Sequence, residues 1–293
     1  MIIDLLAGMA TAPRRLPSPR PTVMVLDSGL GGLTVLAEIR RLRPDAEYLY
    51  AADDAAFPYG NWAEEPLTRR VADVVATLVA AHEPDLVVVA CNTISTLVLP
   101  VLRKRFDLPF VGTVPAIKPA AAQSRTGRIA VLATPGTVRR DYTHGLVAAY
   151  AAECRVDLVG STRLAALAEA ELSGDPAADA AILDEIAPCF VDRDGRRTDT
   201  VVLACTHYPL LLDRMRALAP WPVDWIDPAP AVARRVDQIL GAPRAGTGRS
   251  LLPPCELAIF TGDHAVTPPL ARALARYGLG RVDTRRCPLP HNH

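Results

Sequence analysis

Two similar stretches of sequence decide the fold: DLVVVACNT at residues 85–93 and DTVVLACTH at residues 199–207. Each begins with an acidic residue, continues as an apolar run of strand length, and ends in Ala-Cys followed by small polar residues. Continuous apolar runs of this length are typical of parallel strands that are buried on both faces. Chance similarity between two buried strands would explain the apolar parts but not the matching polar ends. We interpret the repetition as one half-site in each of two lobes.

Apolar runs of this kind recur along the chain, and segments of helix length lie between them. The predicted strands are Val23–Leu26, Tyr48–Ala52, Leu86–Ala90, Phe110–Val114, Ile129–Ala133, Val156–Val159, Thr200–Ala204 and Leu257–Phe260. The predicted amphipathic helices include Leu33–Leu42, Pro66–His82, Val138–Ala151 and Arg163–Leu172. The alternation predicts an α/β fold of two similar lobes, each a mainly parallel sheet flanked by helices, with the active site in the cleft between them.

The expected domain organisation has a discontinuous first lobe. Residues 1–22 hold several prolines and arginines and are expected to form a mobile N-terminal extension. The first lobe is then expected to comprise residues 23–114 and 226–293, and the second lobe residues 115–225. The stretch Gly241–Pro254, rich in Gly, Pro and Arg, is predicted to be a surface loop.

Composition favours a small-molecule ligand. The formal net charge is 0, so no basic field is available to attract nucleic acid. No apolar run reaches the length of roughly 20 residues that crosses a bilayer, and the N-terminus has the wrong order of charges for a secretory signal. The 6 cysteines contain no Cys-x-x-Cys motif, which disfavours a zinc or thioredoxin-type site. We therefore expect a cytoplasmic protein with reduced thiols and no metal.

Other polar segments follow the predicted strands, at the sheet edge where ligands bind in α/β folds. Asp27-Ser28 and the turn Gly29–Gly32 follow the first strand. This turn lacks the G-x-G-x-x-G pattern, which disfavours a dinucleotide site. Asp53-Asp54 and Pro58-Tyr59-Gly60 follow the second strand, although Asp54 is equally well explained as a solvated loop charge. Thr134-Pro135-Gly136-Thr137 follows the fifth strand.

The two cysteines suit proton transfer. A thiol at a helix N-terminus has a lowered pKa and is poised between acid and base near neutral pH, and both Cys91 and Cys205 are predicted to lie there. Two such groups on opposite faces of one carbon can remove a proton from one side and deliver one to the other. The result is inversion of configuration. A cysteine that acted alone as a nucleophile would not need a second copy.

The neighbouring residues suit an amino-acid substrate. Asn92, Thr93 and Thr206, with the amides of the helix starts, can hold a carboxylate, and Ser28 and its glycine turn offer further donors. Asp27 and His207 differ between the half-sites and can each orient or tune the nearer thiol. Asp27 can alternatively anchor a substrate ammonium group.

Together these motifs resemble those of glutamate racemases, in the aspartate/glutamate racemase superfamily, from about Val23 to Leu240. The resemblance rests on Asp27-Ser28-Gly-x-Gly-Gly, Pro58-Tyr59-Gly60, Ala90-Cys91-Asn92-Thr93 and Cys205-Thr206-His207-Tyr208-Pro209. Two departures, Ala204 in place of a usual glycine and Ile94 in place of a usual small residue, remove no reacting group.

The resemblance implies interconversion of L- and D-glutamate without pyridoxal phosphate, metal or other cofactor, to supply D-glutamate for peptidoglycan. By similarity, Cys91 would act on the D-enantiomer and Cys205 on the L-enantiomer, with Asp27 and His207 assisting. Residues that match substrate contacts are Asp27, Ser28, Tyr59, Gly60, Asn92, Thr93, Thr206 and His207. Residues that match further positions of the pocket are Asp53, Thr134, Thr137 and Glu169.

The segment Val111–Pro119 resembles the proteobacterial type of the family. This resemblance implies activation by a UDP-linked muropeptide precursor. A homodimer would also fit the family. Two other functions remain open at this point. A related racemase acting on aspartate or another amino acid would use the same chemistry, and a non-catalytic amino-acid-binding protein would need the carboxylate-holding groups but not two facing thiols.

Overall fold

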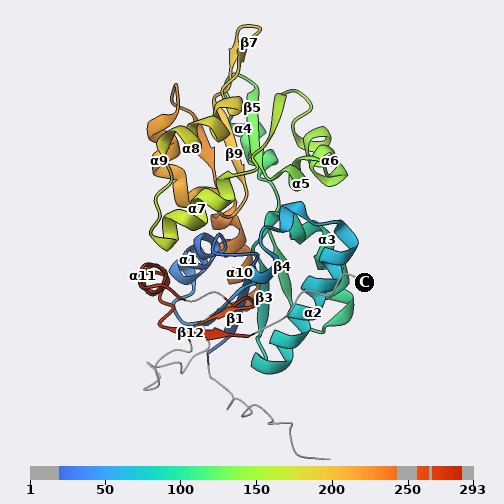
Figure 1. Cartoon of the computed structure of the whole chain (residues 1–293). Coiled ribbons are helices and arrows are strands. Elements are labelled where there is room, and N and C mark those ends of the chain that lie inside the picture. Colours follow the sequence, from blue (N-terminus) through green and yellow to red (C-terminus); the bar gives the residue numbers. More distant parts are fainter. Residues whose placement is uncertain (1–19, 243–255, 264–265, 286–293) are drawn as a thin grey trace, which may run out of the picture.

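The computed structural model describes residues 20–242, 256–263 and 266–285. In this part of the chain, two lobes lie one above the other, and each is built on a parallel sheet with helices on both faces (Figure 1). The predicted α/β class and two-lobed architecture are therefore confirmed. No helix of the described residues is long and apolar enough to cross a membrane.

The first sheet has six parallel strands in the order β12-β11-β2-β1-β3-β4. Its strands are β1 (Thr22–Asp27), β2 (Glu47–Ala52), β3 (Leu86–Val89), β4 (Phe110–Gly112), β11 (Leu257–Phe260) and β12 (Arg281–Thr284). The topological switch point of this sheet lies between β1 and β3, because the chain passes from β1 to β2 on one side and then returns to β3 on the other side. Asp27 and Cys91 follow these two strands, so both lie at the crevice where ligands bind in open α/β sheets.

The second sheet repeats this arrangement with four parallel strands in the order β10-β9-β5-β6. Its strands are β5 (Arg128–Ala133), β6 (Arg155–Gly160), β9 (Thr200–Ala204) and β10 (Asp224–Ile226). The order 6-5-9-10 is the order 2-1-3-4 of the first lobe, with β9 in the place of β3. The sequence repeat that ends in Cys91 and Cys205 is thus a repeat of structure as well. A small antiparallel hairpin, β7 (Asp192–Arg193) with β8 (Arg196–Arg197), projects from the far end of this lobe (Figure 1).

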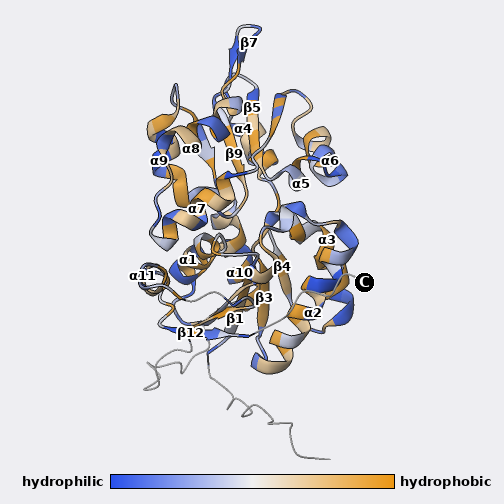
Figure 2. Ribbon diagram, viewed as in Figure 1, coloured by the Kyte–Doolittle hydropathy of each residue, from blue (hydrophilic) through white to orange (hydrophobic). Residues whose placement is uncertain are grey.

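The helices cover both faces of each sheet and enclose four apolar clusters, two per lobe. Around the first sheet lie α1 (Leu33–Leu42), α2 (Glu64–His82), α3 (Asn92–Arg105), α10 (Ala229–Leu240) and α11 (Pro268–Arg276). Around the second sheet lie α4 (Ile117–Gln123), α5 (Pro135–Val138), α6 (Asp141–Tyr150), α7 (Leu164–Ser173), α8 (Asp179–Ile186) and α9 (Leu212–Leu218). The central strands are apolar over most of their length, as the orange colour of β3 and β9 in Figure 2 shows, because helices exclude water from both of their faces.

Within the described residues, the backbone crosses between the lobes twice. It leaves the first sheet after β4, and α4 packs on the second sheet against β9 and α6. It returns after β10, and α10 packs on the first lobe against α1. We therefore propose the lobe boundaries expected from the sequence, near residues 115 and 226.

Most predicted elements lie within two residues of those observed, and α1 matches Leu33–Leu42 at both ends. The predicted helix Val138–Ala151 is wrong in one respect: α5 ends at Val138, and α6 starts anew at Asp141. Of the expected N-terminal extension, residues 1–19 lie outside the described residues, whereas Thr22 already belongs to β1. The predicted loop at Gly241–Pro254 also lies outside them beyond residue 242.

Candidate active site

The two cysteines lie where the lobes meet, each just beyond the carboxyl end of a central strand. Cys91 follows β3 and is the N-cap residue of α3, and Cys205 follows β9. Both are free thiols, and only 6% of Cys91 and 7% of Cys205 is exposed. The predicted helix start holds for Cys91 alone. After Cys205 a turn intervenes, and the short 3₁₀ helix Tyr208–Leu211 begins three residues later.

The environment of Cys91 holds its proton firmly. Burial raises the pKa of this thiol, and the charges of Asp27 and Cys205 raise it further. The backbone amides of Ile94 and Thr93 lower it, as expected at a helix N-terminus, but burial outweighs them. The predicted net lowering is therefore wrong for this closed arrangement.

His207 contacts the second thiol from the same lobe. Its Nδ1 lies 3.8 Å from Sγ of Cys205, and its Nε2 lies 2.6 Å from Oε1 of Glu169 on α7. Burial lowers the pKa of His207, but its hydrogen bonds to Cys205 and Glu169 and the charges of both raise it well above its ordinary value. A protonated imidazole at this position stabilises a thiolate at Cys205.

Asp27 joins the two lobes across the site. Its Oδ2 accepts a hydrogen bond from the hydroxyl of Thr206 at 2.9 Å, and its Oδ1 accepts from the amide of Gly29 at 3.1 Å. The hydroxyl of Ser28 lies 3.4 Å from the same Oδ1. Burial raises the pKa of Asp27, although His207, Thr206 and Gly29 counteract it. The structure thus places Asp27, Ser28 and Thr206 together, as the sequence predicts.

Three threonine hydroxyls form a second link between the lobes. Oγ1 of Thr93 lies 3.1 Å from that of Thr134 and 3.4 Å from that of Thr137, and the latter two are 3.1 Å apart. Beside them, both polar atoms of the Asn92 side chain are buried without a hydrogen-bond partner among the described residues. Such unpaired buried groups are costly unless a ligand satisfies them, so Asn92 is suited to bind a polar substrate.

Tyr59 and Asp53 belong to a buried network in the first lobe. The Tyr59 hydroxyl donates to Oδ2 of Asp53 at 2.7 Å, and Asp53 also accepts from Arg70 at 2.5 and 2.8 Å and from Thr261 at 2.6 Å. Asp53 is therefore a paired structural carboxylate, and Asp54 accepts from the amide of Gly262. A direct substrate contact of the Tyr59 hydroxyl stays a prediction. Arg70 and Thr261, which complete this network, were not predicted from the sequence.

Glycines allow the lobes to approach closely. A Cβ atom on Gly31 would lie 2.5 Å from Nδ1 of His207 and 2.6 Å from Oγ1 of Thr206. A Cβ atom on Gly29 would overlap Oε1 of Glu169, which already accepts from the amide of Leu30 at 2.6 Å. Because glycine has no side chain, the backbone of the first lobe can pack directly against Glu169, Thr206 and His207 at these positions.

The residues of this contact also line a cavity of about 380 Å³. It is lined by residues of both lobes, among them Gly29, Phe57, Glu169 and Leu270. Neither cysteine is among its lining residues.

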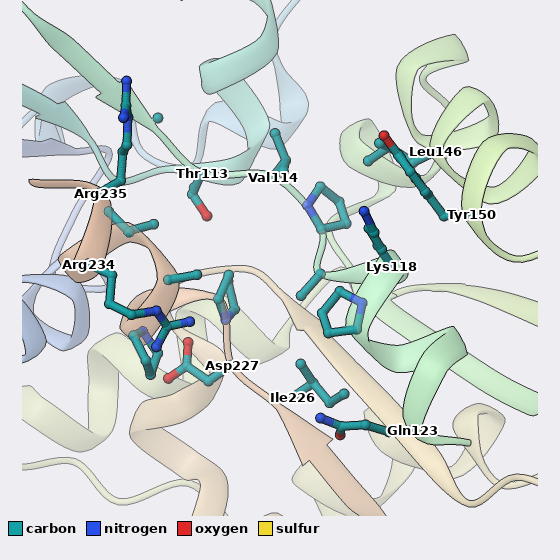
Figure 3. Close-up of a pocket in the computed structure, with 18 of the residues that line it drawn as sticks. Thr113, Val114, Lys118, Gln123, Leu146, Tyr150, Ile226, Asp227, Arg234 and Arg235 are labelled. Carbon is teal, nitrogen blue, oxygen red and sulfur yellow. The ribbon is translucent and has the colours of Figure 1, made fainter. Parts of the chain in front are cut away.

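A larger cavity, of about 580 Å³, lies at the two chain crossings (Figure 3). Residues of the first crossing (Gly112–Ala116) and of the second (Ile226–Pro228) line it. Its rim carries Lys118, Arg234 and Arg235, together with the half-exposed Tyr142 and Tyr150. The ammonium group of Lys118 lies over the Tyr150 ring, 5.3 Å from its centre.

Among the described residues, no three His, Cys, Asp or Glu side chains are grouped as ligands for a metal ion. The polar groups of the site are instead hydroxyls, amides, carboxylates, one imidazole and two thiols. This set of groups can bind an amino acid by its charged ends and move a proton at the carbon between them.

Comparison with known proteins agrees with this geometry. The sequence profile of the Asp/Glu/hydantoin racemase family matches residues 34–236. The glutamate racemase of Brucella canis is 54% identical over 237 residues, which cover 80% of this chain and 85% of that protein. The structure of Escherichia coli glutamate racemase in complex with L-glutamate and the activator UDP-MurNAc-Ala superposes with a TM-score of 0.83 and 40% identity, over 92% of this chain and 99% of that one. Glutamate racemase from Thermus thermophilus superposes with a TM-score of 0.66 and 31% identity, over 93% of this chain and 99% of that one.

The resemblance expected from the sequence motifs is thereby confirmed over most of the chain. The matched segment contains both cysteines and runs from α1 to α10, across both lobes. The chain belongs to the Asp/Glu/hydantoin racemase family.

Proposed function

We propose that the protein interconverts L- and D-glutamate, with Cys91 and Cys205 as the two acid-base groups. The observation that carries this proposal is the placement of two buried free thiols at equivalent positions of the two lobes, each just beyond the carboxyl end of a central strand. Glutamate is the substrate of the relatives that match most of the chain. The reaction is an isomerisation, and its D-glutamate product serves peptidoglycan synthesis.

The chemistry balances without any other reactant. With D-glutamate bound, the Cys91 thiolate takes the α-proton, and the Cys205 thiol delivers its own proton to the opposite face of the carbanion. L-glutamate leaves an enzyme in which Cys91 is the thiol and Cys205 the thiolate. That enzyme form is the one that takes the α-proton from L-glutamate, so the reverse reaction starts where the forward one ends.

The surrounding groups have separate tasks in this proposal. Asn92, whose amide is unpaired, and Thr93 bind a substrate carboxylate at the start of α3. Ser28 and Thr206 lie beside Asp27 and add hydroxyl groups on the other side. His207 stabilises the thiolate form of Cys205. Gly60, whose Cα faces Thr134 across the lobe boundary, contributes its backbone.

Isotope exchange tests the reaction, the substrate and the two-sided mechanism together. In deuterated water, we expect each glutamate enantiomer to be converted into the other and to acquire deuterium at the α-carbon, because the delivered proton comes from a thiol that equilibrates with solvent. Mass spectrometry after chiral chromatography measures both. Conversion of aspartate in preference to glutamate would point to the related racemase, and binding of glutamate without exchange would point to a non-catalytic protein.

We further propose that the cavity at the chain crossings binds a UDP-linked muropeptide activator. Lys118, Arg234 and Arg235 supply positive charge for a diphosphate, and Tyr142 and Tyr150 offer aromatic faces. The activator named with the E. coli relative has this chemistry. A ligand there would contact both crossings and thereby favour one relative position of the lobes.

The activator proposal predicts that UDP-MurNAc-Ala raises the rate of racemisation and binds with measurable heat. Exchange of Arg234 and Arg235 for glutamine should weaken binding at least about tenfold, since each removes a charge-assisted contact to phosphate. Unchanged activity together with no heat on addition of this compound would remove the proposal and leave the racemase proposal intact.

The reaction requires a compartment that keeps both thiols reduced, and we propose the cytoplasm. The homodimer expected from the resemblance stays a prediction, which light scattering of the full chain would decide.

A further inference from the structure

Arg140 reaches from the second lobe into the first. It precedes α6, and its side chain is only 10% exposed. Its Nη1 donates to the hydroxyl of Thr96 on α3 at 3.3 Å, and its Nε lies 3.7 Å from Oε1 of Glu64 on α2. One guanidinium group thus meets two helices of the opposite lobe.

The structural partners of Arg140 do not account for its burial. Its Nε is buried without a hydrogen-bond partner among the described residues. Glu64, its acidic partner, is 65% exposed, and a pair with such a residue contributes little. Burial of a guanidinium with incomplete hydrogen bonding is costly, so a further negative group is expected nearby.

The geometry points to the Cys91 thiol, at the N-cap of the helix that Arg140 contacts, as the candidate for that group. Arg140 bonds to Thr96, one turn into the helix that Cys91 caps. Burial lowers the pKa of Arg140, and the charges of Glu64 and Cys91 raise it. The titratable groups that act on Cys91 or respond to it are Asp27, Tyr59, Arg140 and Cys205. Of these four, Arg140 alone is a cation, while the charges of Asp27 and Cys205 disfavour a thiolate at Cys91.

We propose that Arg140 is a positioning residue that stabilises the thiolate at Cys91 and holds the segment Thr134–Arg140 of the second lobe against the start of α3. This inference rests on the proposed racemase function, in which Cys91 must ionise. It gives each thiol its own cation from the second lobe: His207 for Cys205, and Arg140 for Cys91. The two differ in kind, because an imidazole can release its proton near neutral pH and a guanidinium cannot.

The test follows the ionisation of Cys91 directly in the full-length protein. The rate of alkylation of Cys91 by iodoacetamide, read from its peptide by mass spectrometry, is measured against pH. In Arg140→Gln we expect the midpoint to rise by roughly one pH unit, because an opposite charge close to a thiolate favours that form. Arg140→Lys keeps the charge and should stay near the wild-type midpoint. The matched control Arg139→Gln, at an exposed neighbouring position, should leave it unchanged.

Activity provides the second measurement. The ascending limb of kcat/KM against pH should move upward in Arg140→Gln, by the same amount for both enantiomers, and Arg140→Lys should restore most of the shift. Equal midpoints in Arg140→Gln and the wild type would overturn the inference even if activity fell, since Arg140 would then only support the fold. Failure of the racemase proposal would appear differently, as a wild-type protein that neither interconverts the glutamate enantiomers nor incorporates deuterium at the α-carbon.

Discussion

Replacement of Cys91 by alanine is expected to abolish racemisation of both glutamate enantiomers, and replacement of Cys205 by alanine is expected to do the same. Each direction needs one thiolate to take the α-proton and one thiol on the opposite face to deliver another. Loss of either group therefore removes the base of one direction and the acid of the other. General acid-base groups typically contribute 10²–10⁴-fold, so we expect a fall of at least about 10³-fold in kcat. Time courses by chiral chromatography, started from each enantiomer, measure it.

Cys154→Ala is the matched control for this experiment. Cys154 is a half-buried free thiol of the second lobe, beside Arg128 and Arg155 and away from the lobe boundary. Its loss should leave racemisation within about twofold of the wild type. If either Cys91→Ala or Cys205→Ala still racemised glutamate at a comparable rate, the two-thiol mechanism would be wrong.

Gly31→Ala is expected to leave the protein folded but to lower kcat/KM by about 100-fold. The added methyl group would lie 2.5 Å from His207 and 2.6 Å from Thr206, and backbone on one side and buried side chains on the other leave it no room. The cheapest relief is a slight separation of the lobes, which moves Cys205 away from Cys91. A misplacement of about 1 Å between reacting groups costs on the order of 10²-fold in rate.

Gly145→Ala supplies the control, because a Cβ atom there meets nothing within 4 Å and Gly145 lies inside α6. Alanine at a helix interior should raise stability by about 0.5–1 kcal/mol and leave turnover unchanged. Thermal unfolding by circular dichroism separates the two effects. A wild-type kcat/KM in Gly31→Ala would show that the lobes need not approach as closely as this structure has them.

The sequence predicts the fold well because its strongest signals are local. The runs of β3 and β9 are apolar throughout, which only a strand covered on both faces tolerates, and their repetition marks two equivalent lobes. The break between α5 and α6 is harder to foresee, because Arg139 and Arg140 fit a helix as well as a turn. The break coincides with the contact of Arg140 with α3. That contact joins the two lobes, so the local sequence does not reveal it.

The site is predicted less completely, for a physical reason. Polar residues at strand ends are visible in the sequence, whereas burial depends on how the lobes close. Burial is what raises the pKa of Cys91 above the value that its helix N-terminus alone would give. Arg70 did leave a signal: it lies on the face of α2 shared by Leu67 and Val74. A charge on an apolar helix face requires a buried partner, and Asp53 is that partner.

The double crossing of the chain restricts how the lobes can move. Two connections, at residues 112–116 and 226–228, lie side by side at one end of the boundary, where both line the same cavity. Two adjacent connections restrict the relative motion of the lobes more than one connection would, because both must deform when the lobes separate. If one connection were cut, the lobes would be free to rotate relative to each other. The two thiols would then lose the fixed relative position that inversion at one carbon demands.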